Sequence, residues 1–72
     1  MLRTFEALMR ERSVSRAAAR LFLSQSAVSA SLQKLRDTFD DPLFKRTGHG
    51  VEPTARALAL AIQVEQVLVD IA

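Results

Sequence analysis

Few side chains in this sequence could perform catalysis or hold a metal ion. The 72 residues include no cysteine and one histidine, His49, which stands between two glycines. A thiolate or multi-histidine metal site is therefore excluded. The adjacent acids Asp40 and Asp41 would point apart and end a helix rather than act as an acid–base pair. Because catalysis needs a positioned acid, base or nucleophile in a pocket, the sequence predicts no enzyme, no cofactor and no metal.

Small polar side chains offer a different chemistry, that of contact with another molecule. All six serines lie in residues 13–31, and three of them fall on the first turns of a helix predicted over 25–39. Serine is a mediocre helix former, so its presence on an otherwise good helix indicates a face shaped for contact. The major groove of DNA is about 12 Å wide and admits a helix whose leading face is slim and polar.

The leading face of this helix carries the groups that read base edges. Glutamine suits adenine, serine suits several bases and an alanine methyl suits the thymine methyl. The free amides of the helix start, with the Ser24 hydroxyl, would hold a phosphate. We therefore predict base readout by Gln25, Ser26, Ser29, Ala30 and Gln33.

The charge of the chain is divided between two parts. Residues 1–56 hold all ten Lys and Arg beside six of the eight acids, a net charge of +4, and the two remaining acids give residues 57–72 a net charge of −2. This division predicts a polyanionic partner for the first part and an apolar partner for the second.

Three helices are predicted before residues 42–53, which hold both prolines and both glycines. Apolar residues at helical spacing predict helices over 2–12 and from residue 14, with Ser13 as the N-cap of the second. Ser24 caps the third, over 25–39. Helices at 14–33 joined by three or four residues have helix-turn-helix spacing, in which the second helix enters the major groove.

A short ribbon and a last helix follow. The residue before Pro42 avoids the helical region, so the third helix ends there. Strands are predicted at 43–46 and 51–52 around a hairpin tip at 47–50, with Phe44 as the anchor against the helices. Thr54 caps a fourth helix that reaches the C-terminus.

The fourth helix is apolar nearly all round and must be buried nearly all round. The first three helices can cover one side of it, with Leu58, Ala61, Ile62 and Val69 among the candidates. The other side is predicted to pair with a second copy through a heptad-like seam. The seam residues are Leu60, Val64, Val67, Leu68 and Ile71.

The run Ala17–Ser29, AAARLFLSQSAVS, resembles the helix-turn-helix core of LysR-type transcriptional regulators. Leu2-Arg3-x-Phe5 precedes it as in that family. Asp41–Arg46 resembles the wing, and Thr54-Ala55 resembles the start of the linker helix. The resemblance covers essentially the whole chain.

The resemblance implies a mainly α fold, a winged helix-turn-helix with a three-helix core and a two-stranded wing, followed by a long linker helix. We expect a DNA-binding domain over 1–56, with the helix-turn-helix at about 14–33 and the wing at about 43–52, and a linker or dimerisation helix over 57–72. Contacts to the DNA backbone or minor groove are expected from Arg16, Ser24, Lys34, Lys45, Arg46, Thr47 and His49.

The implied function is sequence-specific binding of double-stranded DNA by a homodimer in a bacterial transcription regulator, on an interrupted palindrome. The sequence shows no secretory signal and no membrane span, so we expect a cytoplasmic protein that joins the nucleoid when bound. The family's effector-binding domain is absent here, so a small-molecule effector would act only through that missing domain, and the chain is expected to be a fragment or a natural truncation.

Four positions depart from the family pattern. Arg36 stands where a glutamate is common, and Asp40 stands where a glycine usually ends the recognition helix. Ala30 replaces a large polar or basic residue, which predicts weaker or more apolar direct readout, and Pro53 replaces an aliphatic residue in the second wing strand.

One alternative from another class is a helical protein-interaction module, because winged helices also bind proteins. The basic first part and the serine-rich leading face favour DNA over a protein partner.

Overall fold

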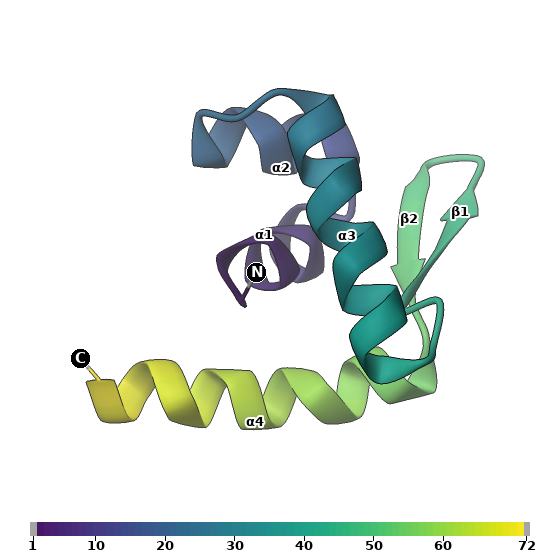
Figure 1. The fold of residues 1–72 in the computed structure, drawn as a ribbon. Coiled ribbons are helices and arrows are strands. Elements are labelled where there is room, and N and C mark those ends of the chain that lie inside the picture. Colours follow the sequence, from purple (N-terminus) through teal and green to yellow (C-terminus); the bar gives the residue numbers. More distant parts are fainter. Residues whose placement is uncertain (1, 72) are drawn as a thin grey trace.

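A computed structural model describes the backbone of residues 2–71 and the side chains of residues 2–66. In this part of the chain four helices and one antiparallel hairpin form a winged helix-turn-helix. The hairpin lies beside α3, and α4 passes the C-terminal end of α3 (Figure 1). The elements are α1 (Leu2–Glu11), α2 (Val14–Leu21), α3 (Gln25–Phe39), β1 (Phe44–Thr47), β2 (Gly50–Pro53) and α4 (Ala55–Ile71).

The helices begin where the sequence places their caps. The hydroxyl of Ser13 accepts a hydrogen bond from the amide of Arg16 at 3.3 Å, and that of Ser24 accepts one from Ala27 at 3.1 Å. Each bond satisfies an amide that has no partner within its helix. The predicted caps are confirmed, and α3 has the predicted bounds.

Both helices of the helix-turn-helix end on residues in the left-handed conformation. Phe22 (φ 57°) follows α2 and Asp40 (φ 50°) follows α3. Glycine usually occupies this position because a Cβ costs energy there. Asp40 therefore adopts the left-handed conformation at the place where the family pattern has a glycine.

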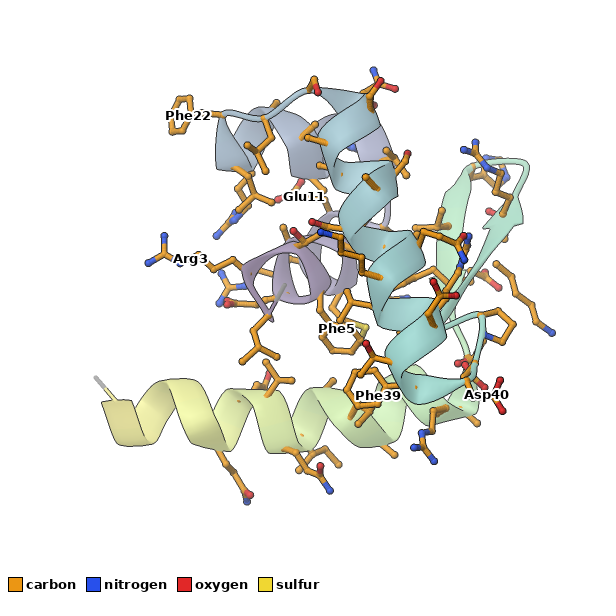
Figure 2. All side chains as sticks on the ribbon, in the orientation of Figure 1. Arg3, Phe5, Glu11, Phe22, Phe39 and Asp40 are labelled. Atoms are coloured by element: carbon orange, nitrogen blue, oxygen red, sulfur yellow. The ribbon has the colours of Figure 1, made fainter. Side chains whose placement is uncertain are left out.

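The core lies between α1, α3 and the base of the hairpin. The Phe5 and Phe44 rings pack there with centroids 5.7 Å apart and planes tilted by 59°. Figure 2 shows Phe5 in the interior of the helix cluster. Phe44 is fully buried at the start of β1, which confirms its predicted role as the anchor of the wing. The buried side chains around this pair include Leu8, Ala17, Val28, Leu35 and Leu43.

Relative to the prediction, β1 is shifted by one residue and β2 is longer by one residue at each end. Leu43 lies outside β1 because its φ is +63° and its side chain is buried. Phe44 pairs with Pro53 at one end of the hairpin and Thr47 with Gly50 at the other. Pro53 stands at the end of β2, where the missing amide of proline is tolerated. The second wing strand therefore forms despite this departure from the family pattern.

The second wing strand is bound to the turn between α1 and α2. The amide of Val51 donates to the carbonyl of Arg12 at 2.9 Å. A Cβ on the neighbouring Gly50 (φ +145°) would meet that same carbonyl oxygen. Only glycine allows so close a backbone approach, so β2 contacts the α1–α2 turn directly at this point.

The face of α4 that packs against the core differs in part from the face predicted from the sequence, so the predicted dimer seam is corrected at two positions. Leu60 and Val64, assigned to the seam with a second copy, pack against the core of their own chain. The exposed large apolar side chains of α4 are instead Leu58 and Ile62, at 50% and 62%. The pattern could not choose between the faces because α4 is apolar on both. The predicted seam residues Val67, Leu68 and Ile71 lie outside the described side chains. Within the described residues, no helix is long and apolar enough to span a bilayer.

Candidate nucleic-acid interface

Helix α3 divides into a buried stripe and an exposed leading face. Val28, Leu32 and Leu35 are buried against the other helices. On the opposite face the structure brings together all five predicted base-reading residues, each exposed to solvent. These are Gln25, Ser26, Ser29, Ala30 and Gln33.

Two residues further along α3 differ in how free their side chains are. The Gln33 amide nitrogen donates to the carboxylate of Asp37 at 3.1 Å, so a base would have to compete with this bond. Lys34 is exposed, and only its backbone carbonyl is engaged, by the hydroxyl of Thr38. The first two turns of α3 therefore hold the freest polar groups.

The wing carries the second group of predicted contacts, with Thr47 and His49 at its tip, Arg46 next to the tip and Lys45 next to its base. Lys45, Arg46, Thr47 and His49 are all exposed. The Thr47 hydroxyl accepts a hydrogen bond from the His49 amide at 3.2 Å, which closes the tip. Figure 1 shows the tip and the first turns of α3 at the same end of the molecule, away from α4. A rod-shaped partner could contact both.

The cations predicted to contact the DNA backbone form no ion pair among the described side chains. Among residues 2–66 the ion pairs join Arg10 to Glu6 at 3.5 Å and Arg20 to Glu11 at 3.2 Å. The predicted backbone contacts Arg16, Lys34, Lys45 and Arg46 take part in neither pair. Arg16 lies exposed in the first turn of α2, beside the Ser13 cap. These side chains are available to phosphate groups.

Arg12 belongs to the same region, although no sequence pattern distinguished it from a solubility charge. A shallow groove between the α1–α2 turn and the wing is lined by Arg12, Thr47, His49, Val51 and Glu52. The guanidinium of Arg12 donates a hydrogen bond to the carbonyl of Met9 at 2.8 Å. The fold brings residues about forty positions apart into contact here, which no local signal announces.

Arg36 was singled out in the sequence only as a departure from the family pattern. It lies on the last turn of α3 and donates to the carbonyls of Pro42 at 2.8 Å and Phe44 at 3.1 Å. The guanidinium therefore bridges the recognition helix and the start of the wing.

Asp41 ties the base of the wing to α4. Its carboxylate accepts hydrogen bonds of 2.8 Å from the amide of Leu43 and from the hydroxyl of Thr54. These bonds, the amide bond first, lower the pKa of the Asp41 carboxyl because they favour its charged form. Thr54 also accepts from the amide of Ala57 and so caps α4 as predicted. Asp40 and Asp41 are thus turn residues and not an acid–base pair.

A family model and curated relatives place this chain in the same family. Residues 1–58 match the family model described as bacterial regulatory helix-turn-helix protein, lysR family. The HTH-type transcriptional regulator LeuO of Escherichia coli is 46% identical over 68 residues, which are 94% of this chain and 22% of that protein. The chain therefore spans about a fifth of the length of such curated relatives.

Solved structures share the fold. A probable transcriptional regulator of Pseudomonas aeruginosa, PA0477, superposes with a TM-score of 0.89 at 46% identity, over 93% of this chain and 22% of that one. The DNA-binding domain of BenM, in a complex with catB site 1 DNA, gives a TM-score of 0.90 at 26% identity, over 97% of this chain and 79% of that one. With its capped recognition helix and docked wing, this chain belongs to the lysR family of bacterial regulatory helix-turn-helix proteins.

Proposed function

We propose that this chain is the sequence-specific DNA-binding domain of a bacterial transcription regulator and that α3 enters the major groove. The observation that carries the proposal is the common placement of two features. The first turns of α3, whose exposed residues are polar or small, and the tip of the wing, which Arg46 adjoins, lie at one end of the molecule (Figure 1). A duplex likewise offers base edges and phosphates side by side.

Base readout falls to the first turns of α3 in this arrangement. Gln25 presents donors and an acceptor that match adenine, and Ser29 can pair with several bases. The exposed methyl of Ala30 fits against a thymine methyl. The Ser24 cap leaves other amides of the helix start directed at the groove, where a phosphate can accept from them.

Phosphate contacts come from the flanks of α3. In the sequence, Arg16 on α2 precedes the recognition helix, and Lys45 and Arg46 on the wing follow it. The other proposed contacts are Lys34, Thr47 and His49. Such contacts carry little sequence information, but they supply much of the affinity and set the register on the duplex.

A second copy of this chain is the proposed partner for the exposed face of α4. Leu58 and Ile62 lie one turn apart on that face and are both at least half exposed. Pairing two such faces about a two-fold axis buries them and presents two recognition helices to an interrupted palindrome. The half-sites would then lie about one helical turn apart, or a multiple of it.

The relatives support the same assignment. BenM contributes a DNA-binding domain solved with DNA, and LeuO is named a transcriptional regulator. By analogy this chain works in the bacterial cytoplasm and binds the nucleoid, and any small-molecule effector acts through a domain outside it.

Selection of bound duplexes from a random library tests the proposal directly. We expect enrichment of a palindromic motif by the unaltered chain and loss of that motif by Gln25→Ala/Ser29→Ala. Absence of any enriched motif would reject sequence-specific binding. The exposed Phe22 and Leu23, at 95% and 46%, would then favour the helical protein-interaction module instead.

A further inference from the structure

The connection between the recognition helix and the wing is wrapped around one side chain, that of Arg36. Its backbone carbonyl accepts hydrogen bonds from the amides of Asp40 and, at 3.3 Å, Asp41. Its guanidinium donates to the carbonyls of Pro42 and Phe44 on the far side of the turn. One residue thus binds four of the eight residues that follow it.

The connection that Arg36 holds is strained. Asp40 and Leu43 have φ values of 50° and 63°, a region that residues with a Cβ seldom adopt. The amide of Phe44 donates to the carbonyl of Pro42 at 2.7 Å across Leu43, so these three residues form a γ-turn with positive φ at its centre. This form of the γ-turn is rare. Strained backbone persists only where surrounding contacts determine it.

The geometry points to Arg36 as a positioning residue for the wing, an inference that rests on the proposed function. The guanidinium binds the carbonyl of Phe44, the first residue of β1, and the next two residues are the wing cations Lys45 and Arg46. The planar fork of Arg36 fixes the direction in which β1 leaves α3. The phosphate contacts of Lys45 and Arg46 therefore depend on a side chain that lies on the recognition helix.

A lysine at this position could not form both hydrogen bonds of Arg36. Lysine keeps the positive charge but offers a single ammonium in place of the two forked donors that reach both carbonyls. Arg36→Lys therefore separates geometry from charge. If Arg36 bound a phosphate directly, the lysine would replace it; if Arg36 positions the wing, the lysine would fail.

The salt dependence of DNA binding measures the effect. The probe is a short fluorescent duplex of mixed sequence, titrated with the chain and its variants over a series of salt concentrations. Each lost phosphate contact lowers the slope of log K against log salt by about 0.9. We expect Arg36→Ala and Arg36→Lys each to lose about one to two units of slope, as Lys45→Ala/Arg46→Ala does.

Combination of the variants identifies the route of the effect. In the Lys45→Ala/Arg46→Ala background, Arg36→Ala should change the slope no further, because the contacts it positions are already gone. An additive loss in this background, or a normal slope for Arg36→Lys, would show that Arg36 meets the phosphate itself and would overturn the inference.

Folding is monitored by circular dichroism and by the amide spectra of the wing. We expect both variants to keep the helices while the Lys45 and Arg46 amides shift. Loss of fold in both variants, or an unchanged slope in both, would mean that Arg36 does not position the wing. If the unaltered chain bound the duplex without salt dependence, the proposed function would fail, and that result differs from every outcome that concerns Arg36 alone.

Discussion

The carboxylate of Asp41 accepts a hydrogen bond of 2.8 Å from the hydroxyl of Thr54, and that hydroxyl also caps α4. A single pair of side chains therefore joins the end of the recognition helix, the base of the wing and the start of the helix proposed to dimerise. The orientation of α4 against the DNA-reading end depends in part on this contact.

Asp41→Asn should destabilise the fold at neutral pH but not in acid. The bonds to Asp41 lower its pKa in the folded state, so the charged carboxyl stabilises the fold above the unfolded pKa of about 3.9. That contribution is lost as the pH falls through the lower, folded pKa. Urea unfolding from about pH 7 to about pH 2 would show the stability gap between variant and unaltered chain closing in acid.

The control for this prediction uses the partner hydroxyl. Thr54→Ser keeps the hydroxyl and should keep the stability, whereas Thr54→Val removes it and should behave like Asp41→Asn at neutral pH. A gap of constant size at every pH would contradict a role for the charged carboxylate.

Lys45→Ala and Arg46→Ala should each weaken binding to all duplexes alike. We expect each variant to flatten the salt dependence by roughly one unit of slope, because each removes one phosphate contact. Fluorescence anisotropy over a range of salt concentrations measures the slope. Arg3→Ala is the matched control, since Arg3 is an exposed arginine on α1 that Figure 2 shows well away from the wing. Equal slopes in all variants would remove the wing from the interface.

Gln25→Ala and Ser29→Ala should reduce discrimination between sequences. We expect a cost of about 1–3 kcal/mol on the selected site and much less on random DNA, since these side chains contact base edges. Thr38→Ala, an exposed polar truncation on the last turn of α3, is the control. Equal losses on both duplexes would mean that Gln25 and Ser29 only position the backbone.

Leu58→Glu/Ile62→Glu should separate the proposed dimer without unfolding the chain. Both side chains are at least half exposed on α4, so the charges would meet a partner and not the core. Sedimentation equilibrium should show a folded monomer with DNA affinity close to that for random sequence. Val64→Glu is the contrast, because Val64 packs on the core and its replacement should lower stability as well. If the unaltered chain is itself a monomer at tens of micromolar, this face does not pair two copies.

Phe22→Gly should raise the free energy of unfolding by about 1 kcal/mol. Phe22 is left-handed and 95% exposed, so it pays a Cβ penalty with no burial in return, and its ring projects from the α2–α3 connection in Figure 2. For a domain of this size that gain raises Tm by about 4–8 °C. Phe22→Ala removes the ring but keeps the penalty, so it should be near neutral. A gain from alanine as large as from glycine would locate the cost in the ring.

Local signals in the sequence were enough for most of the architecture. Ser13, Ser24 and Thr54 begin helices by bonds that span three residues, so their neighbours in the chain suffice to predict them. The exposed face of α3 followed from the spacing of its buried stripe. The exposure of all five predicted base-reading residues is a consequence of that periodicity.

Contacts between distant segments could not be predicted in this way. Arg12 meets the wing and Arg36 meets the carbonyls of the γ-turn only because the chain reverses between α3 and β1. The inward face of α4 was assigned wrongly in part, because a helix with apolar residues on both sides has no periodic signal that selects one. Leu60 and Val64 face inward through packing that the pattern does not encode.

The two glycines of the wing differ in what they permit. Gly50 leaves no room for a side chain against the Arg12 carbonyl, whereas a Cβ at Gly48 would meet nothing within 4 Å. The strand end at Gly50 is thus held against the α1–α2 turn, while Gly48 in the turn between the strands is sterically open. A side chain substituted at Gly48 would therefore extend the hairpin turn outward without meeting the helices, so the reach of the hairpin can be changed at one position while the contact at Gly50 is kept.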